Sequence, residues 1–394
     1  MTSAPAAVDS DRARLGVAVV FVLNGLCFAS LVSRLPDVRA DLSLSNGGLG
    51  LLLLSIALGS LLALPSSGWL IDRWSAATVV RGGSLLVAAG LIVAAAGTGF
   101  FASVPVVALG FFVNGLGTGV WDVAMNVEGA AVERELRRSI MPRFHAGWSG
   151  GSILGATIGV GANAVDLPLV LHLGTVVLLS TATAWWGAAG FLPAHPDHSG
   201  PSGLAAWREP RTLAIGLMVL AFALTEGVAN DWLALGLIDG YGAPDWLGVA
   251  GFALFVVSMT TGRVFGTIVL DRLGRVPVLL ATAGSVLVGL LLVVYGGHPV
   301  LVVVGVVAWG LGASLGFPVG MSAAADEPAR AAARVSVVAT MGYVAFLGGP
   351  PVVGFVADRV GTLSALLVVA VVLVPSVLAI PAARAPVDAL PDRA

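Results

Sequence analysis

Long apolar runs alternate with short polar segments along the whole chain. Twelve of these runs have the length, about 20 residues, that a helix needs to cross ~30 Å of hydrocarbon. They cover residues 15–35, 47–71, 79–101, 104–128, 144–164, 168–192, 213–238, 246–270, 276–296, 299–323, 335–357 and 362–382. The pattern predicts an all-α membrane protein with twelve transmembrane helices.

One polar stretch near mid-chain divides the runs into two sets of six. Residues 193–212 are rich in Pro, Gly and His and predict a linker on the cytoplasmic side. The Gly-Leu-Gly of residues 115–117 recurs at residues 310–312, in the corresponding run of the second set. We therefore expect two related six-helix bundles, residues 1–192 and 213–394, of the kind found in alternating-access transporters.

The distribution of arginine predicts the orientation. The chain has 57% hydrophobic and 11% charged residues, and all 20 basic residues are Arg. With twelve spans, 16 of them fall on the side of the N-terminus and three on the other. Those three are Arg34, Arg39 and Arg359. By the positive-inside rule, both termini are predicted to be cytoplasmic, and the protein is expected in the cell (inner) membrane.

Composition also excludes several classes of function. Without Lys the chain has no P-loop, so nucleotide hydrolysis of that kind is not expected, nor is Schiff-base chemistry. The scattered His residues and the single Cys27 have no metal-ligand spacing, and no nucleophile–base pair stands out, so we expect no enzyme, metal or cofactor. The basic residues 137, 138 and 143 suit anionic membrane lipids better than nucleic acid.

Several motifs resemble one family of carriers. Residues 68–73, Gly-Trp-Leu-Ile-Asp-Arg, and 271–275, Asp-Arg-Leu-Gly-Arg, resemble the cytoplasmic signature of the major facilitator superfamily. Residues 126–135, 226–232, 309–318 and 334–340 resemble the YbjJ-like bacterial inner-membrane carriers and, more distantly, the fucose–proton symporter family. The resemblance implies two pseudo-symmetric six-helix bundles, with spans 1, 4, 7 and 10 around a central cavity and a sugar-like substrate.

Glu226 lies at the middle of the seventh predicted span, and Asn230 follows it by one helical turn. A carboxylate in the bilayer centre costs roughly 2.5–3.5 kcal/mol, and such residues are usually functional or paired. We interpret Glu226 as a proton-coupling residue and Asn230 as a substrate contact; the alternative is a structural acid bonded to neighbouring helices.

The fourth span carries polar residues at every fourth position. They are Asn114, Thr118, Asp122 and Asn126. A helix facing lipid would not tolerate such a stripe. Asp122 is a second candidate for proton coupling and the other three for substrate binding, or the stripe is a packed contact between helices.

Asn24, Trp309 and Tyr343, in spans 1, 10 and 11, are further candidates for substrate binding. Aromatic faces suit the apolar face of a sugar ring, although aromatic residues in spans more often serve packing.

Charged residues in the cytoplasmic half form a candidate gate. Arg263 and His145 stand at the predicted depth of Asp122 and Glu128, which suggests a cluster that locks one transport state or a permanent structural pair. By family resemblance, Asp72 with Arg73 and Asp271 with Arg272 face helix N-termini, where the helix dipole favours an anion. The alternative for the two arginines is simple membrane anchoring.

These observations predict a secondary active transporter, working as a monomer, that moves a small polar organic solute by alternating access with proton coupling. Two alternatives stay open. One is a proton-driven exporter of toxic amphiphiles or metabolites, and the other is a solute receptor that does not transport.

Overall fold

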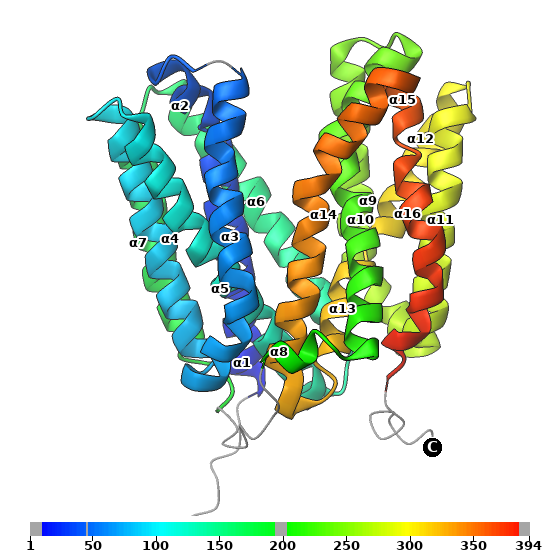
Figure 1. Ribbon diagram of the computed structural model, residues 1–394, viewed down its shortest axis with the longest axis horizontal. Coiled ribbons are helices and arrows are strands. Elements are labelled where there is room, and N and C mark those ends of the chain that lie inside the picture. The colour runs from blue at the N-terminus through cyan, green and yellow to red at the C-terminus, as the bar shows by residue number, and fades with distance from the viewer. Residues whose placement is uncertain (1–9, 45, 194–202, 386–394) are drawn as a thin grey trace, which may run out of the picture. The chain divides into compact units, whose positions relative to one another are not determined.

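The computed structural model describes residues 10–44, 46–193 and 203–385. Within these ranges the chain is helical and has no β-strand (Figure 1). The described residues form two compact units. The first comprises residues up to 136, 147–203 and 328–336, and the second comprises residues 137–146, 204–327 and 337 onward.

The first unit contains most of the N-terminal helices. They are α1 (Ser10–Val32), α2 (Leu35–Asp41), α3 (Asn46–Trp74), α4 (Ala76–Gly99), α5 (Val104–Leu136), most of α6 (Met141–Ala164) and α7 (Leu169–Ala188). The 3₁₀ turn η1 (Pro328–Arg330) and the first turn of α14 (Ala331–Val360) also belong to it.

The second unit contains the rest. Its helices are α9 (Pro210–Tyr241), α10 (Asp245–Leu273), α11 (Arg275–Tyr295), α12 (Pro299–Ala313), α13 (Gly316–Ala324), most of α14, α15 (Thr362–Ala365), α16 (Val368–Ser376) and the 3₁₀ segment η2 (Val377–Ala383). The short α8 (Gly203–Ala206) precedes it, and residues 194–202 of the predicted linker lie outside the described residues.

Every predicted apolar run coincides with helical structure. Eleven stretches of the described helices are long and apolar enough to cross a membrane. The run not counted among them is α6, which has 24 residues but includes six glycines that lower its mean hydropathy. Helix α5 continues to Leu136, eight residues beyond the predicted end.

Two runs predicted as single helices are interrupted. The tenth run is divided into α12 and α13 at residues 314–315, because Pro318 has no N–H to donate to the carbonyl of Ser314. The twelfth run is divided into α15, α16 and η2, with Pro375 and Pro381 inside its last two segments.

The two units differ from the predicted halves at two short segments. Residues 137–146 belong with the second unit, and residues 328–336 belong with the first. In the first unit Gly68 of α3 lies against the backbone of Ala332, and the hydroxyl of Ser336 donates to the carbonyl of Leu64. The first turn of α14 is therefore packed on the end of α3.

Glycines bring helices of the first unit into backbone contact. On α6, a Cβ at Gly151 would lie 1.9 Å from the carbonyl oxygen of Val22, and one at Gly155 would lie 2.4 Å from that of Leu26. On α5, a Cβ at Gly115 would lie 2.1 Å from the carbonyl oxygen of Ile56. Small residues at helix contacts supply the close van der Waals packing that holds membrane helices together.

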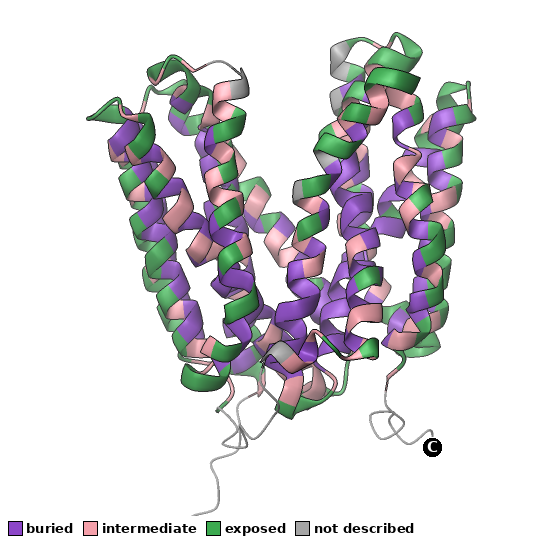
Figure 2. Cartoon of the chain, in the orientation of Figure 1, coloured by how far each residue is buried: buried purple, intermediate pink, exposed green. Residues whose placement is uncertain are grey.

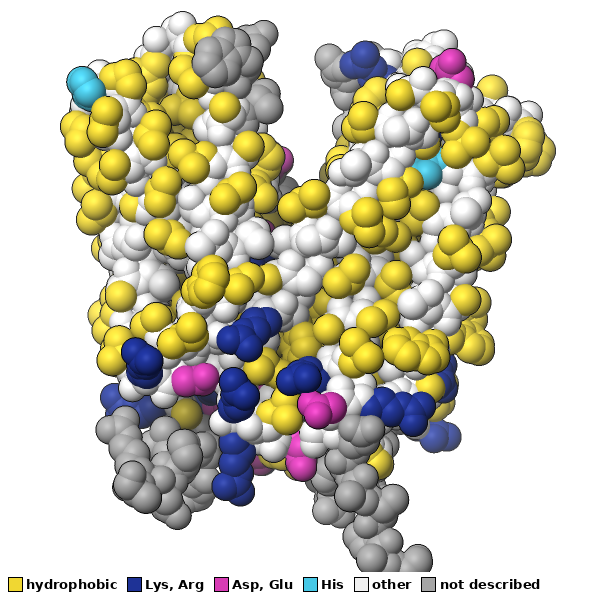
Figure 3. Space-filling view, turned by 180° about the vertical axis from the view of Figure 1, so that it is seen from behind, with side chains coloured by type: hydrophobic (Ala, Val, Ile, Leu, Met, Phe, Trp, Pro, Cys, Tyr) yellow, Lys and Arg dark blue, Asp and Glu magenta, His cyan; other side chains and the backbone are white. Residues whose placement is uncertain are grey.

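The outer surfaces of the helices are apolar. Exposed residues (green in Figure 2) include large side chains such as Leu51, Leu179 and Leu378. In each unit, hydrophobic side chains (yellow in Figure 3) cover the sides, and Arg side chains gather near one end. A surface with so many exposed leucines is compatible with the hydrocarbon of a membrane and not with water.

The contact between α1 and α6 gives a testable prediction. We expect Gly151→Ala to lower the free energy of unfolding by roughly 1–3 kcal/mol, because the new methyl group must push α1 away. Thermal unfolding of the purified protein in detergent measures the effect.

The neighbouring residue provides the control. A Cβ at Gly150 meets nothing within 4 Å, so Gly150→Ala should leave stability unchanged or raise it by up to about 1 kcal/mol. Equal melting temperatures for the two variants would show that the close contact does not exist.

Candidate functional site

Two buried charges lie against each other in the second unit. Nη2 of Arg263, on α10, donates to Oε2 of Glu226, at the middle of α9, over 2.8 Å. Arg263 is 3% exposed and Glu226 is 8% exposed. An isolated charge in apolar surroundings costs several kcal/mol, so each of these groups is tolerated because the other is present.

The pair joins two helices that are long enough to span a membrane. Oε2 of Glu226 accepts from the guanidinium of Arg263, so α9 and α10 are linked by a charge-assisted hydrogen bond between buried side chains. Asn230, the predicted neighbour one turn along α9, is exposed and so lies in a different environment from Glu226.

His145 shares part of this neighbourhood. It is buried in the second unit, where its ring packs edge-on against Phe317 with the centroids 5.5 Å apart. Arg263 is its charged neighbour. The predicted grouping of His145 with Arg263 thus has a structural counterpart, although the carboxylate that pairs with Arg263 is Glu226.

The two other acids of the predicted cluster lie in the first unit. Glu128 is buried and accepts a hydrogen bond from the backbone N–H of Leu192 at 2.6 Å, just beyond α7. Asp122 is also buried. Glu128 thus holds the segment that follows α7 through the backbone N–H of Leu192.

The polar stripe of α5, which belongs to the first unit, is largely buried. Asn114, Asp122 and Asn126 are buried, and Thr118 is partly exposed. The amide of Asn126 donates to the backbone carbonyl of Asp122 at 2.9 Å. The stripe thus faces protein and not lipid, as its polarity requires.

The predicted aromatic contacts have different environments. Trp309 is fully buried and packs edge-on against Phe255, which gives it a packing role here and presents no face to a solute. Tyr343 is partly exposed beside Phe346.

Asn24 is buried, and its side-chain oxygen accepts from the indole N–H of Trp148, on α6, at 2.9 Å. Trp148 was not identified from the sequence. An indole N–H favours an acceptor, but this holds for every tryptophan of the spans and does not single out Trp148.

An aspartate caps the start of α6. Oδ1 of Asp271, at the end of α10, accepts from the backbone N–H of Ser139 at 2.9 Å, two residues before α6 begins. This is the arrangement that the family resemblance implied for Asp271. Asp72 is exposed near the end of α3, as are Arg73 and Arg272 beside the two aspartates.

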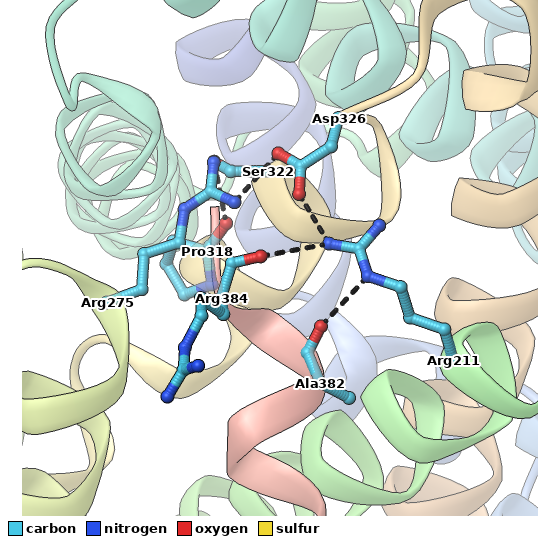
Figure 4. Close-up of polar contacts among 7 residues, drawn as sticks. All are labelled: Arg211, Arg275, Pro318, Ser322, Asp326, Ala382 and Arg384. Carbon is cyan, nitrogen blue, oxygen red and sulfur yellow. Dashed lines mark hydrogen bonds and ion pairs between the residues drawn. The ribbon is translucent and has the colours of Figure 1, made fainter. Parts of the chain in front are cut away.

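A second polar network in the second unit was not predicted. Asp326, just after α13, accepts from Arg211 of α9 at 2.5 Å and from Arg275 of α11 at 2.7 Å (Figure 4). Arg211 also donates to the backbone carbonyls of Ala382 and Arg384. The arginine distribution indicates membrane anchoring for Arg211 and Arg275. It does not indicate that the carboxylate after α13 links α9 and α11, or that Arg211 links them to η2.

Within the described ranges, no three His, Cys, Asp or Glu side chains gather in a way that could hold a metal ion.

Comparison with known proteins identifies the family. The family model described as Major Facilitator Superfamily matches residues 241–393. The "Uncharacterized transporter y4wD" of Sinorhizobium fredii is 33% identical over 87% of this chain and 90% of its own length. The "Uncharacterized MFS-type transporter YPO1221/y2967/" of Yersinia pestis is 30% identical over 86% of this chain and 88% of its own length.

The crystal structure of the E. coli fucose:proton symporter FucP superposes with a TM-score of 0.76, covering 94% of this chain and 98% of that one at 16% identity. This match confirms the predicted all-α fold of two six-helix bundles. On these relatives and this fold, the chain belongs to the major facilitator superfamily and is a multi-pass membrane transporter.

Proposed function

We propose that this transporter moves a small polar organic solute, sugar-like in its chemistry, and couples that movement to protons by alternating access. The buried pair of Glu226 and Arg263 carries the proposal. It stands at the middle of two helices long enough to span a membrane, where a carboxylate is rarely kept without a function.

The energy of the pair is of the size that coupling needs. Removing one partner of a buried ion pair costs about 3–5 kcal/mol. Shifting a two-state equilibrium from 1:99 to 99:1 takes about 5.5 kcal/mol. A proton that neutralises Glu226 therefore supplies much of the bias between two transport states, and buried Asp122 in the first unit is the second candidate acid.

Other observations support a gradient-driven carrier of polar solutes. The chain has no Lys for a nucleotide-binding P-loop. The first unit offers Thr118 beside buried Asn114 and Asn126 for solute contacts, and the second offers exposed Asn230 and partly exposed Tyr343. The name of FucP states proton symport of a sugar, and the fold is shared with it.

The gate is part of the same proposal. Asp271 accepts a hydrogen bond from the backbone N–H of Ser139, just before α6. We assign to the control of cytoplasmic opening Asp271, Arg272, Asp72, Arg73, Glu128, His145 and Arg263. The gathering of Arg side chains near one end of each unit supports cytoplasmic termini in an inner membrane (Figure 3).

The coupling role of Glu226 is tested by Glu226→Gln. We expect solute counterflow in proteoliposomes to persist while an imposed pH gradient no longer drives accumulation, because an amide cannot take up the proton. Glu135→Gln, at an exposed acid near the end of α5, is the matched control and should behave as the native protein.

The solute for this assay is chosen by counterflow screening of sugars, nucleosides, amino acids and organic acids. Full dependence on the pH gradient in Glu226→Gln would remove Glu226 from the coupling role. Counterflow of amphiphiles alone would favour an exporter, and binding without counterflow would favour a receptor.

The energetic importance of the pair is tested by Arg263→Ala. This variant leaves Glu226 buried opposite no cation, so we expect the free energy of unfolding to fall by about 3–5 kcal/mol. The double variant Arg263→Met with Glu226→Leu removes both charges and should recover most of the loss.

Thermal unfolding in detergent measures both variants. Equal instability of the single and double variants would contradict the pairing. In a cysteine-accessibility assay, an unchanged balance of inward and outward states in Arg263→Ala would remove Arg263 from the gate.

A further inference from the structure

Two aromatic side chains and an amide form a compact group on α1 and α6. The rings of Phe28 and Trp148 have their centroids 5.5 Å apart and are inclined by 34°. The indole N–H of Trp148 donates to the side-chain oxygen of Asn24, one helical turn from Phe28 on the same face of α1. Phe28 is 50% exposed, whereas Asn24 and the residues that flank Phe28 are buried.

The helices that carry the group are held rigidly. A Cβ at Gly25 would lie 2.1 Å from the carbonyl oxygen of Trp148, so α1 touches the backbone of α6 beside the indole. The single O–H of Ser152 is shared between the carbonyl of Trp148, at 3.1 Å, and that of Gly25, at 3.3 Å. Side chains fixed in this way lose little freedom when they bind a ligand.

The amide of Asn24 indicates what this face meets. Its oxygen is occupied by Trp148, while its nitrogen donates to no acceptor among the described residues and is not sealed from the surface. Amide N–H groups left unbonded in hydrocarbon cost several kcal/mol. The face with Asn24 and Phe28 is therefore suited to water or a polar solute and not to lipid.

The chemistry of the group selects a class of solute. Aromatic faces bind the C–H face of a ring, and an amide N–H binds a hydroxyl or ring oxygen at its edge. An open-chain polyol has the same hydroxyls but no rigid apolar face. Trp309, by contrast, is buried on all sides and presents no ring to a solute.

We propose that Trp148 and Phe28 form a binding platform for a ring-shaped polyhydroxylated solute, with the amide nitrogen of Asn24 donating to it. The identification of this solute as the transported one rests on the proposed function. The platform itself lies within the first unit and is defined by the contacts between α1 and α6.

Binding to the purified protein in detergent tests the platform. Glucose and xylose are compared by calorimetric titration with sorbitol and xylitol, which have the ring opened, and with a cationic amphiphilic dye. We expect the native protein to bind at least one of the two sugars and to bind its open-chain partner more weakly. Trp148→Leu and Phe28→Leu should each weaken the binding of that sugar by about tenfold.

Two further variants guard against a loss of folding. Trp148→Phe keeps an aromatic ring but loses the bond to Asn24, so we expect a smaller loss of affinity than in Trp148→Leu. Trp186→Leu, at an exposed tryptophan of α7, should bind as the native protein does. Melting temperatures near that of the native protein show which variants are folded, and half-exposed Phe28 is the substitution least dependent on packing.

Counterflow of the bound sugar separates this proposal from the proposed function. If the sugar binds through the platform but shows no counterflow in the native protein, the platform stands and the transport of this solute fails. Unchanged binding in folded Trp148→Leu and Phe28→Leu would overturn the platform even if the sugar is transported. So would binding of the open-chain polyols or the dye alone, or of none of these probes.

Discussion

The carboxylate in the middle of α9 can be buried only because a guanidinium of α10 lies 2.8 Å from it. The same rule governs several other polar groups that these helices carry into hydrocarbon, since lipid offers no partner. Glu128 accepts a hydrogen bond from a backbone N–H after α7, and Asn126 donates one to a carbonyl of its own helix. The indole of Trp148 donates to Asn24. Many polar residues of the spans are therefore positioned by hydrogen bonds to one another. Fewer positions are left that could bind a solute or a proton.

Glycine makes that arrangement compact. Contacts through Gly151 and Gly115 bring backbones close enough for short side chains such as Ser152 to bond across the helix interface. Close contact limits the freedom of the helices, so the groups they carry keep a defined geometry. The charged network around Asp326 has a similar effect at the end of the second unit, where it joins α9 and α11 to the end of the chain's last helix.

Apolar runs and glycine patterns predicted the helices well, because the length needed to cross hydrocarbon leaves few alternatives. The breaks near Ser314 and in the last span were not predicted, since a proline such as Pro318 is tolerated in some helices and interrupts others. Buried polarity identified Glu226 and Arg263 as important but did not pair them, because pairing depends on how α9 and α10 are rotated. Trp148 was missed for the same reason, as its contact with Asn24 joins residues 124 positions apart.

The glycines of α6 have a consequence for biogenesis. A segment with six glycines and a histidine near its start gains less from entering lipid than its neighbours do. Helix α1, which is made earlier and whose backbone α6 touches at Gly151, is available to receive it. We therefore expect membrane integration of this segment to depend on α1 already being in place, so that a change that loosens α1 would affect synthesis as well as the finished carrier.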